Sequence, residues 1–236
     1  MNKKFITAIT LTAALGFAAN NAQADTYHYE DTWVNWPGYG SSHTNDELGT
    51  PNINSMDVIV TDDYLTRVDI NLRSGSPRQT YDSLFINTSY NGTNWDEWNY
   101  LVRDEYGSGH AANTIGFEAG DGFWSVNDPT NYSYTTTIDE EGGWNVREGN
   151  PNGIDASGLT STILPYTVSF TSNTISYTFG STDLKLDGGF FVAYAPWCAN
   201  DVIGGGAPVP EPATMLLFGT GLVGLATIRR RKMKRA

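Results

Sequence analysis

The chain has 236 residues, of which 14 are Lys or Arg and 26 are Asp or Glu, so its formal net charge is −12. All acidic residues fall between Asp25 and Glu211, whereas most basic residues lie near the two ends. The middle of the chain therefore repels phosphate backbones, which excludes nucleic acid as a partner. The single cysteine, Cys198, excludes an internal disulfide, a Cys-rich zinc site and an iron–sulfur cluster.

The N-terminal residues have the three parts of a secretory signal peptide. Lys3 and Lys4 precede a mostly apolar stretch over residues 5–19, and Ala22 and Ala24 then form a small-x-small site for signal peptidase. The sequence predicts a signal peptide over residues 1–24, cleaved after Ala24. An uncleaved anchor is the less favoured alternative, because polar residues end the apolar run early.

About 185 residues remain between the two ends, which is enough for one domain with its own core. Several segments alternate between apolar and polar residues, as half-buried strands do; Val68, Ile70 and Leu72 share one face of their segment. A short turn at 172–173 predicts a hairpin. The expected strands cover residues 56–61, 64–73, 83–90, 99–104, 132–138, 166–171, 174–179 and 189–195.

No helical stripe of useful length interrupts these strands, so we expect an all-β, jelly-roll-like β-sandwich over residues 25–203. Residues 82–86 followed by the Trp-rich segment 95–102 resemble the carbohydrate-binding and DOMON-like sandwiches. That resemblance favours the sandwich and assigns no ligand. The Gly-rich residues 204–208 are expected to form a flexible spacer after the domain.

Acidic loops suggest a Ca²⁺ site, since Ca²⁺ prefers hard oxygen ligands. The candidate ligands are Asp46 and Glu47 near the start of the domain and Asp201 near its end. First and last strands often lie close together in a jelly roll, so the two loops are expected to share an ion. The competing interpretation is that these are solvated charges on an acidic surface.

Aromatic residues suggest carbohydrate contact, with Trp95 and Trp98 as the candidates. In a regular strand the two rings would point to opposite faces, one inward and one outward. The competing interpretation is core packing, which is the usual role of a buried Trp.

Enzymatic activity is not expected. The three histidines, His28, His43 and His110, have no metal-ligand spacing, and no G-x-S-x-G elbow marks a nucleophile. Adjacent carboxylates such as Asp96 and Glu97 would point to opposite faces of a strand. A secreted glycoside hydrolase remains the alternative, because paired carboxylates perform that chemistry.

The C-terminal residues form a second three-part segment. Val209, Pro210, Glu211 and Pro212 lead into an apolar run over 213–228, and Arg229, Arg230, Arg231 and Lys232 begin a basic tail over 229–236. As a helix the run is roughly 24 Å long, slightly short of a ~30 Å hydrocarbon core, but the flanking Arg side chains can snorkel. The positive-inside rule keeps the basic tail cytoplasmic and places the domain in the periplasm.

This tail resembles the PEP-CTERM sorting signal of exosortase substrates. The resemblance rests on Pro210-Glu211-Pro212, on Gly219, Gly221 and Gly224 within the apolar run, and on residues 229–232. It implies an exported protein of a Gram-negative type of bacterium, anchored in the inner membrane, processed by an exosortase and then released to the cell surface. A plain single-pass anchor is the alternative.

The family implied by the tail occurs mostly in bacteria that make exopolysaccharide. We therefore expect a surface or matrix protein with a structural or adhesive role. A carbohydrate-binding module for exopolysaccharide is the first alternative, and a secreted glycoside hydrolase is the second. The G-x-G-x-x-G pattern at 219–224 implies no nucleotide, because neither a βαβ unit nor a following acidic residue accompanies it.

Overall fold

A computed structural model describes residues 24–33, 35–39, 51–78, 81–105, 121–136, 149–196 and 198–208. The predicted signal peptide, apart from Ala24, and the C-terminal segment 209–236 lie outside these residues. Within the described part no helix has the length and apolar character needed to cross a bilayer.

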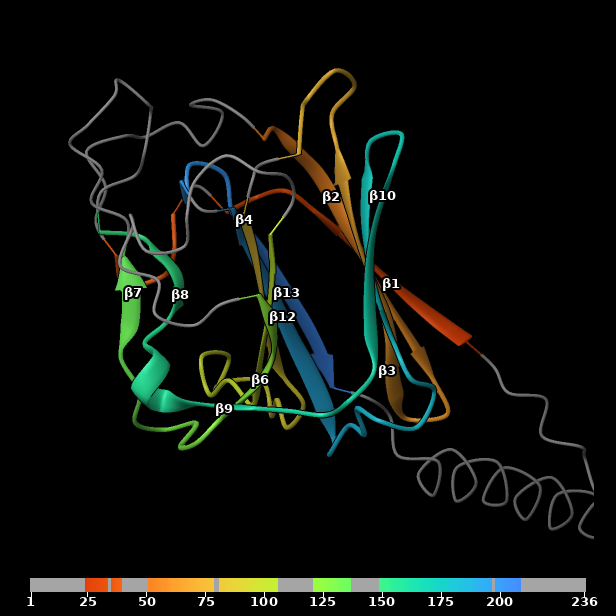
Figure 1. Ribbon diagram of the computed structural model, residues 1–236. Helices are drawn as coiled ribbons and strands as arrows, with labels where there is room; N and C mark the ends of the chain where they lie inside the picture. Colours follow the sequence, from red (N-terminus) through yellow and green to blue (C-terminus); the bar gives the residue numbers. More distant parts are fainter. Residues whose placement is uncertain are drawn as a thin grey trace, which may run out of the picture.

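The described residues form two packed antiparallel sheets (Figure 1), which confirms the all-β sandwich. Sheet A has the order β1-β2-β3-β11-β10 and sheet B the order β13-β12-β4-β5-β6-β9, while β7 and β8 form a separate pair. The strands are β1 (Ala24–Glu30), β2 (Ile53–Thr61), β3 (Tyr64–Leu72), β4 (Tyr81–Asn87), β5 (Tyr100–Glu105), β6 (Gly122–Val126), β7 (Tyr134–Thr136), β8 (Pro151–Ile154), β9 (Leu159–Ser161), β10 (Tyr166–Thr171), β11 (Thr174–Phe179), β12 (Gly189–Pro196) and β13 (Ile203–Pro208), with a 3₁₀ turn at Ala156–Gly158.

The chain passes between the two large sheets three times, from β3 to β4, from β9 to β10 and from β11 to β12. β3 neighbours β11 in sheet A, and β4 neighbours β12 in sheet B. The strand order confirms a sandwich of antiparallel sheets, and the jelly-roll arrangement stays a prediction.

Alternating segments became half-buried strands, as the pattern predicts. In β3, Val68, Ile70 and Leu72 enter the core between the sheets, while Arg67 and Asn71 face outward. The predicted hairpin is also present: β10 and β11 pair around a turn at Ser172–Asn173, with Thr171 opposite Thr174.

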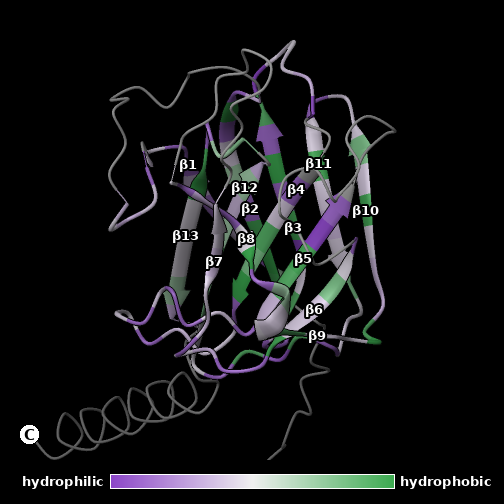
Figure 2. Ribbon diagram, turned by 60° about the vertical axis from the view of Figure 1, so that its left-hand side comes forward, coloured by the Kyte–Doolittle hydropathy of each residue, from purple (hydrophilic) through white to green (hydrophobic). Residues whose placement is uncertain are grey.

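The central strands of sheet B are buried on both faces, which explains the continuous apolar runs in β4 and β12. Every residue of β12 is buried. Phe190, Val192 and Tyr194 enter the core between the sheets, whereas Phe191 and Ala193 enter a second cluster on the outer face. Figure 2 shows β7 and β8 lying in front of this outer face, so part of the molecule has a third layer.

The expected Gly-rich spacer is instead the edge strand β13, whose residues Ile203–Pro208 pair with β12. The glycines allow aromatic rings to approach the backbone. A Cβ at Gly204 would lie 2.4 Å from a ring atom of Trp33, and one at Gly205 would lie 2.3 Å from Tyr29. The expectation of a spacer was wrong because glycine signals close approach in a strand as well as flexibility.

Candidate functional site

An aromatic cluster covers the outer face of sheet B. Trp36 lies at its centre and is 1% exposed. Its ring centroid is 5.1 Å from Phe85, 6.2 Å from Trp98 and 5.9 Å from Tyr134. Edge-to-face and tilted contacts at these separations are favourable for aromatic pairs, so the cluster forms a firm support for the residues above it.

The loop between β4 and β5 carries two carboxylates beside this cluster, and asparagine side chains fix its shape. Asn87 donates to the carbonyl of Asn94 at 2.6 Å, and Asn99 accepts from the Thr88 amide at 2.7 Å. Asn91 accepts from the Thr93 amide at 3.0 Å. Amide side chains that bond to nearby backbone groups stabilise turns in this way.

A groove opens over the aromatic cluster, with a volume of about 680 Å³. Three tyrosine rings and two carboxylates give it both apolar faces and hydrogen-bonding groups. Its lining residues are Tyr39, Asp96, Glu97, Pro129, Thr130, Tyr132, Ser133, Tyr134 and Thr136. An open, aromatic and polar groove can hold a polyhydroxylated ligand, whose ring faces are apolar and whose edges hydrogen-bond.

A chain of hydrogen bonds fixes the orientation of Tyr132 and Tyr134 in the groove. Trp98 Nε1 donates to Tyr134 Oη at 2.7 Å, the hydroxyls of Tyr134 and Tyr132 lie 3.0 Å apart, and Tyr132 donates to the carbonyl of Asp96. The rings of Tyr39 and Tyr134 meet edge to face at 5.8 Å. The side chains are thus oriented without a ligand, which reduces the entropy lost on binding.

Burial raises the pKa values of the groove tyrosines, which would be protonated near neutral pH even at the ordinary tyrosine pKa of about 10. It raises the pKa of Tyr134 to about 12 and moves the pKa of Tyr132 well above the ordinary value. The pKa of Tyr39 is raised for the same reason. Near neutral pH the three residues are therefore neutral phenols, while Asn94 donates to the carboxylate of Glu97 at 2.8 Å.

The predicted tryptophans lie in the supporting cluster. Trp98 is fully buried, so it cannot contact a glycan directly, and its role is to hold Tyr134. Trp95 is half-buried and packs against Trp98 at 5.9 Å. Residues 95–98 form a turn before β5, so the alternation expected of a strand does not apply, and Asp96 and Glu97 both line the groove.

The groove tyrosines Tyr39, Tyr132 and Tyr134 are not among the binding residues that the sequence predicts. A signal for two of them was present, because Tyr132 and Tyr134 share one face of the segment expected as strand 132–138. Their meeting with Tyr39 and the β4–β5 loop depends on long-range contacts.

Asp201, a predicted calcium ligand, is 1% exposed and bonds within the protein. Its Oδ2 accepts from the amide of Ile53 at 2.5 Å, which connects the β12–β13 turn to the start of β2. The other two candidates, Asp46 and Glu47, lie outside the described residues, and no group of three metal-binding side chains occurs among the residues that are described. The idea that Asp201 is a solvated charge is wrong, and calcium binding stays a prediction.

A second buried polar cluster lies inside the sandwich. Arg78 Nε donates to Asp82 at 2.6 Å, Arg78 also pairs with Asp104, and Tyr194 Oη donates to Asp82 at 2.6 Å. Burial raises the pKa of Asp82 to about 6 and outweighs the attraction of Arg78. This cluster connects β4, β5 and β12 and has the character of a structural ion pair.

Comparison with known proteins identifies one segment. Residues 208–232 match the PEP-CTERM protein-sorting motif, which confirms the resemblance drawn from the sequence. The motif implies export, transient anchoring in the membrane, processing by an exosortase and sorting to the cell surface. The motif residues Val209–Pro212 and the basic residues 229–232 lie outside the described part. No curated protein and no solved structure matches the chain.

Proposed function

We propose that this exosortase-sorted protein is an adhesive component of the cell surface or matrix and binds neutral polysaccharide through its tyrosine-lined groove. The groove itself carries the proposal: Tyr39, Tyr132 and Tyr134 lie beside Asp96 and Glu97 over a rigid aromatic cluster. Calcium binding and the periplasmic orientation of the domain before sorting belong to the same proposal.

The tyrosine rings and the carboxylates of the groove would contact different parts of a sugar. Apolar faces of sugar rings pack on tyrosine rings, as other apolar groups do on aromatic surfaces. The carboxylate oxygens of Asp96 and Glu97 accept hydrogen bonds from sugar hydroxyls, and such charge-assisted bonds are the stronger kind.

Charge favours a neutral ligand over a polyanionic one. The chain carries 26 acidic against 14 basic residues, and two carboxylates line the groove. A polymer of uronic acids would meet repulsion both at long range and in the groove. A neutral exopolysaccharide meets no such barrier.

Affinity electrophoresis of the full chain in detergent tests the proposal, with neutral exopolysaccharide from the source bacterium as the probe and polygalacturonate as the polyanionic control. We expect retardation by the neutral polymer only. Tyr39→Ala should weaken retardation about tenfold or more, and Tyr39→Phe, which keeps the ring, should preserve most of it. Equal retardation of wild type and Tyr39→Ala, or none with the neutral polymer, would refute the proposal.

The hydrolase alternative has one supporting observation, which is that Asp96 and Glu97 both line the groove. The same probe distinguishes the two functions. Release of reducing ends by the wild type, abolished in Glu97→Gln, would replace binding by hydrolysis. Retardation of the polymer without release of reducing ends supports the binding function.

A further inference from the structure

One long part of this acidic chain carries no charge. No Asp, Glu, Lys or Arg occurs between Asp155 and Asp183, and this stretch contains β10 and β11. Two copies of a chain with net charge −12 repel each other over most of their surface. β10 itself brings no carboxylate to a contact between two copies, and the carboxylates of Asp121 and Asp104 act on its first residue, Tyr166.

β10 is an edge strand of sheet A, and no charge or proline lies within it, although Pro165 directly precedes its first residue. Among the described strands, the opposite edge β1 carries charged residues, including Asp25 and Glu30, and β9 at one edge of sheet B has only 3 residues. β13 at the other edge ends in Pro208. Charge, short length and proline are recognised means of blocking unwanted strand pairing.

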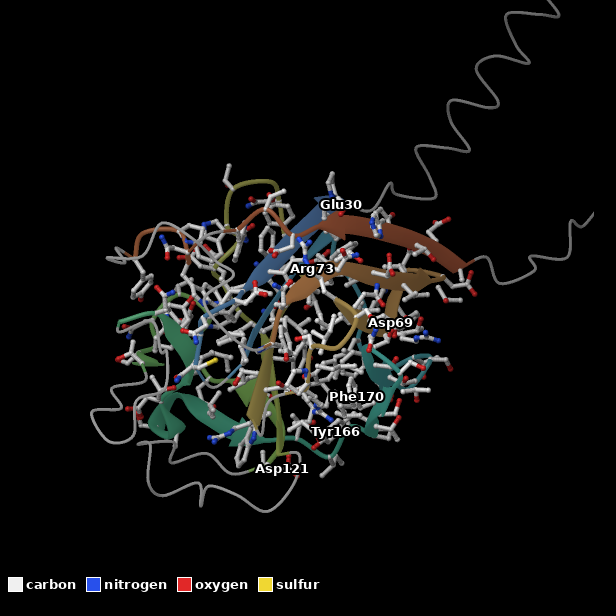
Figure 3. The ribbon with its side chains drawn as sticks, turned by 90° about the horizontal axis from the view of Figure 1, so that it is seen from above. Glu30, Asp69, Arg73, Asp121, Tyr166 and Phe170 are labelled. Carbon is white, nitrogen blue, oxygen red and sulfur yellow. The ribbon has the colours of Figure 1, made fainter. Side chains whose placement is uncertain are left out.

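β10 has 6 residues, no charge, no proline and an unbroken register with β11. Its outward side chains are Thr167, Ser169 and Thr171, all exposed, and its core-facing side chains are only half-buried. Figure 3 shows two of the latter, Tyr166 and Phe170, on the core side of the strand. The outer backbone groups of an edge strand of this kind can bond to another strand.

The side chains of β10 are self-complementary. If two β10 strands pair antiparallel about Ser169, Thr167 of one copy faces Thr171 of the other, and Val168 faces Phe170. Each residue then meets one of its own character. The existing hairpin uses the same scheme, because Ser169 faces Ser176 and Val168 faces Tyr177. Pairs of this kind stabilise neighbouring strands.

An apolar side chain next to the strand is also exposed. Ile163, three residues before β10, is the one large hydrophobic side chain that is exposed in the described part of the chain. A single exposed Ile is common on protein surfaces, so it is the edge strand itself, and not Ile163, that indicates a contact surface.

We propose that β10 is a self-association surface, through which two copies of the chain pair antiparallel about Ser169 and join their A sheets into one. Such a two-fold interface is closed, so it gives dimers and not filaments. The charged edge β1 does not extend the assembly. This surface shares no residue with the groove, so dimerisation and polysaccharide binding can fail independently. A matrix protein that dimerises in this way would present two grooves.

Cysteine cross-linking of the full chain in detergent tests the register. Directly opposed residues of an antiparallel pair have Cβ atoms ~4.5–5.5 Å apart, close to the distance that a disulfide needs. Ser169→Cys should therefore form a disulfide-linked dimer on mild oxidation. Thr178→Cys, on the same outward face but one strand further in, should not. Cys198 is buried, and burial raises its pKa to about 12, so it does not compete.

Sedimentation velocity measures how strongly the two copies associate. Ser169→Asp would place two carboxylates opposite each other and should weaken dimerisation on the order of tenfold, whereas Thr178→Asp should leave it unchanged. Both positions are exposed, so neither variant should prevent folding. A monomeric wild type, equal cross-linking of the two cysteine variants, or equal weakening by the two aspartate variants would overturn the proposal.

Discussion

Gly205→Ala tests whether the Gly-rich end of the domain is a strand or a spacer. In the strand, the added Cβ would lie 2.3 Å from Cδ1 and 2.5 Å from Cγ of Tyr29, atoms near the base of that ring. Tyr29 packs against the core, so it cannot simply rotate away. Overpacking of this kind costs about 1–3 kcal/mol, and the lower entropy of the unfolded chain returns about 0.4–1 kcal/mol.

The expected result is a net loss of roughly 1–2 kcal/mol, which lowers the unfolding temperature by about 2–8 °C for a domain of this size. A flexible spacer would instead give unchanged or slightly higher stability, because only the entropy contribution would act. Thermal unfolding followed by near-UV circular dichroism measures the difference.

Gly158→Ala is the matched control for this experiment. A Cβ at Gly158 would meet its nearest atoms at 3.5 Å, an ordinary contact distance, so we expect a change within about 0.5 kcal/mol. A Gly205→Ala protein that is as stable as the control, or more stable than the wild type, would refute the packing of Tyr29 on β13.

Three further outcomes follow from the buried polar groups. Burial raises the pKa of Asp82 to about 6, so the folded protein favours the protonated carboxyl group. The resulting contribution to stability is fully present below the unfolded pKa of 3.8 and is lost as the pH rises through 6. Urea titrations should therefore show the wild type losing stability relative to Asp82→Asn between pH 4 and 7. Tyr134→Phe removes the acceptor of the buried Trp98 N–H and should cost about 1–3 kcal/mol, measured by urea unfolding, with weaker polysaccharide retardation. Asp201→Ala removes the acceptor of the Ile53 amide and should also lower the free energy of unfolding by about 1–3 kcal/mol. An equal loss of stability with and without EDTA supports the internal hydrogen bond. A loss of stability seen only without EDTA would make Asp201 a calcium ligand.

Local sequence patterns determined the strands that have one face in the core. Alternation at Val68, Ile70 and Leu72 predicts β3, and the 172–173 turn predicts the β10–β11 hairpin, because a half-buried strand must change polarity at every second residue. The tail was also readable from sequence. Its proline pair, apolar run and basic end are contiguous, so recognising them requires no tertiary contacts.

Other features depended on residues far apart in the chain. The central strands of sheet B do not alternate between apolar and polar residues, because both faces of these strands are covered. The turn at residues 95–98 places Asp96 and Glu97 on the same side, in the lining of the groove. The groove joins them to tyrosines from two other segments, and no local pattern predicts such a meeting.

The glycines of β13 show most clearly what local sequence patterns cannot predict. A glycine run has no side chains to alternate, so its conformation is decided by the β12 backbone and by the rings of Tyr29 and Trp33, which come from the other end of the chain. The sequence by itself determined the strands that alternate between core and solvent, such as β3, β10 and β11, and the sorting motif at residues 208–232. Tertiary structure alone decided which glycines form a strand, which carboxylates are buried and which aromatic rings line the groove, because each of these outcomes depends on partners that are distant in sequence.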